Sequence, residues 1–454
     1  MDQKKTVQQK IPKRILSSLI SSVSAGVVPR AGAPFIAIGR RDEINAFLSD
    51  LEMINEGGGT MRFLIGRYGS GKSFLIQLIR GYSLERDFLT ADCDLSPERR
   101  LYGSGGAGVA TYRELMKNLA SKSSPDGGAL QKIIAKWIFS IQETTSVDVR
   151  DDPERCASAL EMEIRRQLGE IEFLVGGFDF SRVIREYYVS TVRGDENRAD
   201  ACLRWLRGEY SAKTEARREL GFDVSTVIGD SNWYDFLKLW AALSHRMGYR
   251  GLLVFIDECV NLYKIPHRIS RENNYEKILS MFNDTLQGRA SYLGLVLGGT
   301  PQFLEDTRRG LFSYEALRSR LCDSRFSVDG CRNLVGPVIR LARLSDDELL
   351  ALIVRMTSLH AQNYGWEPRL SADDQVEFLK SCLDRAGADS MITPREMLRD
   401  YMTVLNILMQ NPEMTFSDIM KKNPSLTGEP DSGKDISDNS EKEIKKFDPD
   451  DIDF

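Results

Sequence analysis

The sequence predicts an α/β protein in which helices surround a parallel sheet. The apolar run Met61–Ile65 has the length of a strand, and a glycine-rich loop and a helical pattern over 73–80 follow it at once. Three further apolar runs, at 88–93, 251–256 and 293–297, predict at least four strands in all, with helical patterns between them. The repeated order of strand, loop and helix is typical of a parallel sheet.

The first element is expected to be a helical arm within residues 1–38. Its apolar residues recur at helical spacing, at Ile11, Ile15, Leu19 and Val23. The basic residues before this stretch resemble the start of a secretory leader. Five serines between residues 15 and 28 interrupt the apolar run, so we interpret it as an amphipathic arm.

The rest of the chain is predicted to form a sheet domain that a helical insertion divides. We expect the two parts of the sheet domain at 39–130 and 231–337, because the strand patterns lie in these ranges. Between them, 131–230 has helical patterns and no convincing strand. A helical domain is expected at 338–422, opened by a capping-box pattern at Ser345–Glu348.

Composition restricts the class of protein. The 454 residues carry a net charge of -5, and the last 32 residues, 423–454, hold ten acidic residues against four lysines. This tail is expected to be disordered, and the rest of the chain is close to neutral. No uncharged apolar run approaches the 18 residues of a membrane span. The seven cysteines form no CxxC pair and the three histidines are far apart, which disfavours disulfides or zinc and indicates a cytoplasmic protein.

The glycine-rich loop after the first strand fits the pattern G-x-x-x-x-G-K-[ST]. Its residues are Gly66, Arg67, Tyr68, Gly69, Ser70, Gly71, Lys72 and Ser73. Such a loop wraps backbone N–H groups around the phosphates of ATP, while Lys72 reaches the β- and γ-phosphates and Ser73 ligates Mg²⁺. The alternative is an ordinary glycine-rich turn. It is disfavoured because the loop leaves a strand and opens a helix, whose N-terminus attracts anions.

Two adjacent carboxylates, Asp257 and Glu258, end the apolar strand that begins at Leu252. Unpaired acids at the end of a buried strand are costly unless they hold a cation or a partner. We therefore expect Asp257 to support the magnesium shell and Glu258 to polarise the attacking water, which predicts ATP hydrolysis. The alternative is a pair of acids that is solvated at a strand end.

Three further residues are candidates for contact with the γ-phosphate. Thr300 follows the strand 293–297 and would lie beside this phosphate as a sensor, or it would cap the next helix. Arg318 and Arg320 lie near the end of a helix. One of them is expected to reach the ATP of a neighbouring subunit as an arginine finger, unless both are solvated surface residues.

Arg395 is a fourth candidate, in the first turn of a later helix. The run Thr393–Glu396 is a capping box with proline at the first helical position. The helix dipole disfavours a cation at this end. A nearby anion would explain the arginine, so we expect contact with the γ-phosphate, with pairing to a carboxylate as the alternative.

The order of these motifs resembles that of AAA+ P-loop ATPases, in the clade of origin-recognition and helicase-loader proteins. Four phrases more narrowly resemble the BrxD ATP-binding proteins of bacterial BREX phage-defence systems. They are Val28–Gly32, Ile38–Glu43, Asp94–Leu101 and Ile392–Arg399. The resemblance covers about residues 25–410, and it implies an AAA+ fold with a helical lid.

The resemblance also assigns roles to single residues. It implies that Gly39 and Arg40 border the adenine of ATP, and it agrees with the phosphate, metal and sensor roles given above. Thr300 stands where many relatives have asparagine, which weakens its assignment. No winged-helix segment follows the predicted lid, which argues against DNA binding of the origin-recognition type.

Two hypotheses describe what the ATPase drives. The first is a homo-oligomer that acts on double-stranded DNA in phage defence or DNA maintenance, with other defence-system proteins as partners. Residues 181–218 support it, with nine basic against six acidic residues and four interleaved aromatics. The aromatics are Tyr187, Tyr188, Trp205 and Tyr210, and the candidate phosphate contacts are Arg182, Arg185, Arg193, Arg204 and Arg207. The second hypothesis is a nucleotide-controlled signalling or scaffold switch that recruits effector proteins without binding DNA.

Overall fold

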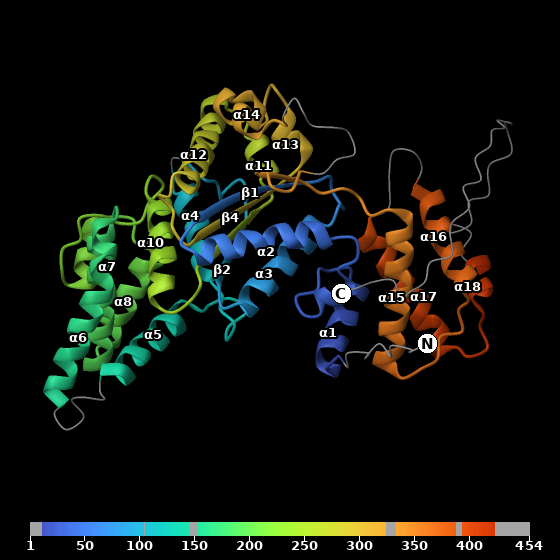
Figure 1. Cartoon of the computed structure of the whole chain (residues 1–454), viewed down its shortest axis with the longest axis horizontal. Coiled ribbons are helices and arrows are strands. Elements are labelled where there is room, and N and C mark those ends of the chain that lie inside the picture. Colours follow the sequence, from blue (N-terminus) through green and yellow to red (C-terminus); the bar gives the residue numbers. More distant parts are fainter. Residues whose placement is uncertain (1–10, 104, 146–152, 324–332, 387–392, 423–454) are drawn as a thin grey trace, which may run out of the picture. The chain divides into compact units, whose positions relative to one another are not determined.

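The computed structural model describes residues 11–103, 105–145, 153–323, 333–386 and 393–422 (Figure 1). The chain divides into two compact units. The helical unit consists of Met1–Arg41, Arg67–Leu78 and Leu341–Phe454, and the sheet unit consists of Asp42–Gly66 and Ile79–Arg340. The predicted acidic tail, 423–454, lies outside the described residues.

The sheet unit contains five parallel strands in the order β2-β3-β4-β1-β5. The strands are β1 (Gly59–Ile65), β2 (Leu89–Asp94), β3 (Leu252–Asp257), β4 (Leu293–Gly299) and β5 (Val338–Arg340). This confirms the predicted α/β class with a parallel sheet. Because all the strands are parallel, their carboxyl ends lie along one edge of the sheet.

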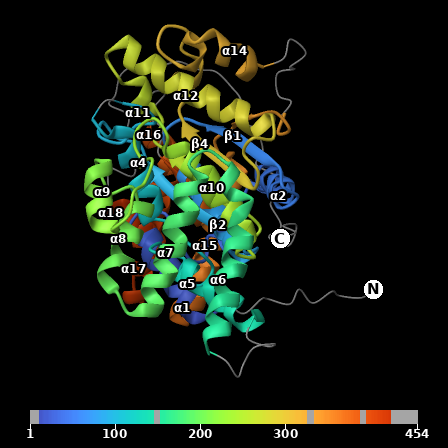
Figure 2. The same ribbon diagram turned by 90° about the vertical axis from the view of Figure 1, so that its left-hand side faces the viewer.

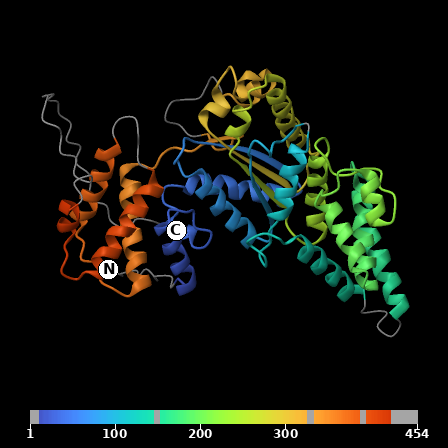
Figure 3. The same cartoon turned by 180° about the vertical axis from the view of Figure 1, so that it is seen from behind.

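Helices cover both faces of the sheet, as is usual for a parallel sheet. Every residue of β3 and β4 is buried. On one face, α12 (Arg268–Leu286) contacts β1, and α10 (Trp233–Arg246) contacts β3 and β4. The other face is covered by α2 (Arg41–Asn55), whose Ile54 lies so close to β4 that a Cβ atom at Gly294 would collide with it. Figures 1 and 3 view the layers from opposite sides.

The sheet unit has further helices after its strands. They are α3 (Lys72–Glu85), which begins in the helical unit, α4 (Ala107–Lys117), α11 (Val260–Tyr263), α13 (Pro301–Glu305), η3 (Leu311–Ser313) and α14 (Glu315–Leu321).

A group of helices lies between β2 and β3, and in the described part of 131–230 it contains no strand. Its members are α5 (Leu130–Thr145), α6 (Pro153–Gly169), η2 (Ile171–Phe173), α7 (Gly177–Arg193), α8 (Glu196–Leu206) and α9 (Lys213–Leu220). These helices pack side by side (Figure 2). Aromatic rings join them to α10, since Trp205 meets Phe236 and Phe180 meets Trp240 edge to face, with centroids 5.4 and 5.1 Å apart. The group therefore shares one core with the sheet.

The helical unit has a core of its own. Its elements are α1 (Lys13–Ser24), η1 (Ala33–Ile36), α15 (Asp346–Tyr364), α16 (Ala372–Ala386), α17 (Pro394–Gln410) and α18 (Phe416–Lys422). The apolar face of α1 packs on α15 and α17, and Leu19, Met356 and Tyr401 are fully buried there. Both predicted capping boxes, at Ser345 and Thr393, are present. No described helix is long and apolar enough to cross a membrane.

Candidate nucleotide-binding site

The loop between β1 and α3 has a backbone that only glycine adopts readily. Gly69 and Gly71 have φ values of 76° and 88°, in the left-handed region. The backbone N–H of Gly66 donates to the carbonyl of Gly299 at the end of β4, over 3.1 Å. The hydroxyl of Ser70 is buried and has no hydrogen-bond partner among the described residues. A loop with this backbone and an unsatisfied buried hydroxyl fits a polar group such as a phosphate.

Arg40 supports this loop from within the helical unit. Its buried guanidinium donates through Nη2 to the carbonyls of Ser70, over 3.0 Å, and Ala342, over 2.9 Å. The neighbouring Gly39 has a φ of 71°, and a Cβ atom there would overlap the carboxylate of Glu348. Arg40 therefore fixes the loop backbone. Contact of Gly39 and Arg40 with adenine stays a prediction.

Lys72 and Ser73 begin α3, and the N-terminus of a helix favours an anion through its dipole and its backbone N–H groups. The Lys72 ammonium donates to the carbonyl of Arg67, over 3.1 Å. Arg67 and Tyr68 are exposed at the tip of the loop, and Tyr68 is 84% accessible to solvent. Both side chains are therefore accessible to a bound molecule.

The N-terminus of α17 lies against the loop. A Cβ atom at Gly69 would come within 2.9 Å of Thr393 Cβ, so the two backbones approach closely. Arg395 follows in the first turn and is exposed, and its aliphatic part packs over Gly26. No carboxylate among the described residues forms an ion pair with Arg395. Hydrogen bonds from Thr393, and then the charges of Arg399 and Arg395, lower the pKa of the Glu396 carboxyl. Contact of Arg395 with the γ-phosphate and its pairing with a carboxylate both stay predictions.

Asp257 and Glu258 lie at the end of β3, as predicted. Asp257 is buried, and its Oδ1 accepts the backbone N–H of Glu258 over 2.8 Å. A Cβ atom on Gly298 of β4 would overlap this oxygen, so the glycine makes room for the carboxylate. Glu258 has a φ of 55°, which costs a residue other than glycine about 1–2 kcal/mol. Such strain is typical of functional sites.

A third carboxylate, that of Asp94, was not predicted from the sequence. Asp94 ends β2 and pairs in register with Asp257. Partial burial, and then the charges of Asp257, Glu258 and Asp92, raise the pKa of Asp94. A bound cation would relieve this repulsion. The missed signal is an acid directly after the predicted strand 88–93, in the same position as Asp257 after its strand.

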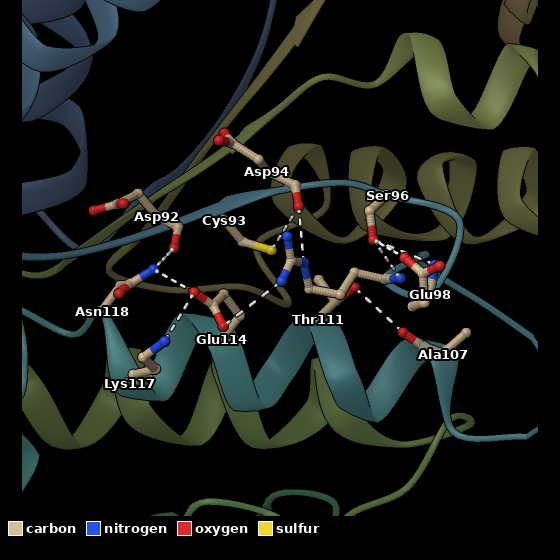
Figure 4. Close-up of polar contacts among 11 residues, drawn as sticks. Asp92, Cys93, Asp94, Ser96, Glu98, Ala107, Thr111, Glu114, Lys117 and Asn118 are labelled. Carbon is tan, nitrogen blue, oxygen red and sulfur yellow. Dashed lines mark hydrogen bonds and ion pairs between the residues drawn. The ribbon is translucent and has the colours of Figure 1, made fainter. Parts of the chain in front are cut away.

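Polar contacts behind Asp94 fix the strand end. The carbonyl of Asp94 accepts the Nε–H of Arg99 over 3.1 Å, while Asn118 donates to the carbonyl of Asp92 over 2.9 Å. Figure 4 shows the Asp94 carboxylate directed away from Glu114 and Asn118. It also shows the thiol of Cys93, whose burial raises its pKa to about 12, so this thiol stays protonated at neutral pH.

Thr300 follows β4 directly and caps α13. Its hydroxyl oxygen accepts the backbone N–H of Phe303 over 3.3 Å. The capping alternative is therefore confirmed, and the sensor role stays a prediction.

Arg318 and Arg320 are exposed in the last turn of α14. The guanidinium of Arg318 lies 3.7 Å from Glu315 of the same helix, an exposed pair that contributes little to stability. Arg320 donates to the carbonyl of Ala316 over 2.7 Å. Because both side chains are exposed and these two contacts lie within α14, a neighbouring molecule can reach them.

One part of the DNA hypothesis is wrong. The four aromatic residues proposed to stack on bases are buried in the core of the insertion, where bases cannot reach their faces. They are Tyr187, Tyr188, Trp205 and Tyr210. The sequence pattern did not reveal this because α7 and α8 direct their aromatic faces inward, against α10 and against each other.

Most of the proposed phosphate-binding arginines have partners within the insertion. Arg207 pairs with Glu209 over 2.7 Å, and Arg185 lies 3.8 Å from Glu172. Arg204 is 3.5 Å from Glu209. The guanidinium of Arg182 stacks on Phe222 at 4.4 Å from the ring centroid. These partners reduce the free positive charge that a DNA backbone would meet.

A cation at the sheet edge would need ligands from outside the protein. Among the described residues, no group of three or more His, Cys, Asp or Glu side chains is arranged to hold a metal ion. Magnesium commonly keeps one or two carboxylates and completes its shell with water and phosphate oxygens. The buried carboxylate of Asp257 at the end of β3 fits this mode.

Comparison with known families supports a nucleotide site. Residues 11–424 match the model of the family described as BREX system ATP-binding protein BrxC/D. This match confirms the resemblance inferred from the sequence motifs. No curated protein matches the chain.

Proposed function

The chain belongs to the BREX ATP-binding protein BrxC/D family, and from this premise we propose that it hydrolyses ATP with Mg²⁺. Its place in phage defence and its binding of ATP follow from the family. The observation that carries hydrolysis is the strained Glu258 next to the buried Asp257. β4 lies between β3 and β1, so the loop that starts at Gly66 leaves the same sheet edge.

Each residue of the proposed site has a distinct task. The loop N–H groups and Lys72 bind the phosphates, and Ser73 and Asp257 offer oxygen ligands to Mg²⁺. Bound Mg²⁺ would neutralise part of the negative charge that develops on the phosphates. Glu258 orients the attacking water and accepts its proton. Because the backbone of Glu258 is left-handed, its side chain does not follow the alternating directions of the strand residues before it.

Two residues are proposed to contact the γ-phosphate from other elements. Arg395 lies in the first turn of α17, and Thr393, which caps this helix, lies close to Gly69. Thr300 offers a hydroxyl at the end of β4, although this oxygen already accepts a hydrogen bond from Phe303. Arg395 has the stronger support, because no carboxylate among the described residues forms an ion pair with it.

We further propose that the protein forms a homo-oligomer in which Arg318 or Arg320 acts on the neighbouring ATP. Both guanidiniums are exposed, and among the described residues they contact Glu315 and Ala316 of the same helix. A bidentate donor of this type stabilises charge on a phosphoryl group.

The second candidate function, a protein-recruiting switch, gains support from the insertion. Its aromatic residues are buried and most of its candidate arginines are paired. Double-stranded DNA stays in the proposal as a partner of the oligomer, where each subunit contributes a few phosphate contacts. Of the five candidate arginines, Arg193 at the end of α7 is exposed and has no ion pair among the described residues.

Nucleotide binding and hydrolysis are tested with Lys72→Ala. Wild-type protein should release phosphate from ATP, and EDTA should abolish the release because Mg²⁺ is required. Lys72→Ala should lose both nucleotide affinity and turnover, since the phosphates lose their cation. Parent turnover in Lys72→Ala would disprove the site. DNA-stimulated turnover that falls with salt would favour the DNA hypothesis, and indifference to DNA would favour the switch.

A further inference from the structure

We propose that the junction between η2 and α7 is a docking surface for a short apolar segment of another protein of the same defence system. The surface, here called the apolar junction, consists of Phe173, Leu174, Val175 and Phe178. It lies in the insertion, from the end of η2 to the first turn of α7. The proposal is independent of ATP hydrolysis, because none of these residues belongs to the proposed ATP site.

The side chains of the apolar junction are unusually exposed for their chemistry. Phe173 is 92% accessible, Val175 69%, Phe178 57% and Leu174 44%. These four residues fall within six positions of the sequence. With roughly 200 Å² for a large side chain, they expose about 500 Å² of apolar surface. Exposed apolar surface of this size, gathered on one short segment of a soluble protein, commonly marks a binding site.

The backbone under the apolar junction is fixed. Gly176 has a φ of 76°, and a Cβ atom there would lie 2.9 Å from the ring of Phe236. At Gly177 a Cβ atom would overlap the carbonyl of Ile171. Hydrogen bonds close the turn, from Leu174 N–H to Ile171 over 3.0 Å and from Gly177 N–H to Leu174 over 2.8 Å. A tight turn with this close packing holds its side chains outward at little entropic cost on binding.

The charges beside the apolar junction are already paired within the chain. Glu172 lies 3.8 Å from Arg185, and Glu170 forms an ion pair with Arg246. These charged residues beside the apolar junction therefore present no excess of positive charge that would attract a nucleic acid. It also offers no strong attraction to an acidic or basic peptide. An uncharged apolar segment is the chemistry that complements this surface.

The size of the apolar junction indicates a peptide rather than a second copy of the chain. A stable protein dimer buries about 800 Å² on each partner, and the four side chains supply no more than about two thirds of this area. A short helix or strand that inserts two or three apolar side chains needs no larger contact area. The occupant is therefore a short segment that belongs to another protein.

The experiment compares two triple variants of the full chain. Phe173→Ser/Val175→Ser/Phe178→Ser removes the apolar junction. The matched control, Val192→Ser/Ile269→Ser/Leu286→Ser, removes three apolar residues elsewhere that are 62–69% exposed. Each purified protein of the same defence system is tested for binding to the immobilised wild type and variants by biolayer interferometry. ATP turnover and thermal unfolding are measured in parallel, and both should match the wild type.

We expect one of these proteins to bind the wild type and the control equally, and the junction variant at least tenfold more weakly. A synthetic peptide from that protein's apolar segment should compete. The proposal is overturned if the junction variant binds as tightly as the wild type, or if none of the proteins binds. It is also overturned if sedimentation shows a wild-type dimer that only the junction variant dissolves, since the occupant is then a second copy. Loss of turnover in Lys72→Ala with binding unchanged would separate this surface from the ATP site.

Discussion

Replacing Gly298 by alanine should displace the carboxylate of Asp257 and slow ATP turnover. The added Cβ atom would lie 2.9 Å from Asp257 Cγ and overlap Oδ1. Ordinary contacts between carbon atoms are about 3.5–4.0 Å, so one group must move by roughly 0.5–1 Å. Both residues lie in buried strands, and overpacking of this kind costs about 1–3 kcal/mol of stability.

The effect on catalysis should exceed the effect on folding. A displacement near 1 Å in a positioned group costs up to about 100-fold in rate, so we expect turnover to fall about 10–100-fold at saturating ATP. The Mg²⁺ concentration needed for half-maximal rate should rise, because Asp257 is a proposed ligand. Phosphate release across a magnesium series measures both quantities, and circular dichroism reports whether the variant folds.

Gly81→Ala is the matched control. Gly81 lies within α3, and a Cβ atom there meets nothing within 4 Å. Alanine should stabilise this helix by about 0.5–1 kcal/mol and leave turnover unchanged. If folded Gly298→Ala hydrolyses ATP at the parent rate with the parent magnesium dependence, the orientation of Asp257 is irrelevant to catalysis and our reasoning is wrong.

Two other predictions concern pH and assembly. Burial lowers the pKa of His360, whose Nδ1 accepts the indole N–H of Trp366 over 2.8 Å. As the pH falls, His360 therefore binds a proton at a higher pH in the unfolded chain than in the folded chain. The free energy of unfolding should fall as the pH drops below about 6.5, and it should level off once the pH is below the lowered pKa of the folded chain. Urea titrations should show this fall, and His360→Phe should flatten it. Separately, mixing an Arg318→Ala/Arg320→Ala chain with a Lys72→Ala chain should restore part of the turnover, because some mixed interfaces contain both intact halves. No recovery at any ratio, with assembly confirmed by light scattering, would disprove the trans-acting role.

The sheet was largely predictable because long apolar runs mark buried strands. The runs at 251–256 and 293–297 became β3 and β4 almost residue for residue. β5 was not predicted, since Val338–Arg340 is too short for a periodic signal. It is a strand because its backbone pairs with Phe63–Ile65 of β1, which is a contact between residues far apart in the sequence.

The candidate site was predictable where local chemistry defines it. The glycine loop and the capping box at Thr393 are short patterns that determine their own backbone. The supporting role of Arg40 was not predictable, because it depends on the carbonyls of Ser70 and Ala342, which tertiary structure brings together. The burial of Tyr187 likewise depends on helix packing, and a pattern of interleaved charge cannot distinguish an inward from an outward aromatic.

The most direct test of the account is a comparison of nucleotide binding and hydrolysis in Glu258→Gln. The substitution keeps the shape of the side chain and removes the carboxylate that would accept the proton of water. We predict that the variant binds a fluorescent ATP analogue within about twofold of the wild type, while its single-turnover hydrolysis rate falls by about 100-fold or more. Hydrolysis at the parent rate with ATP fully bound would mean that Glu258 is structural, and it would contradict the proposed catalytic mechanism.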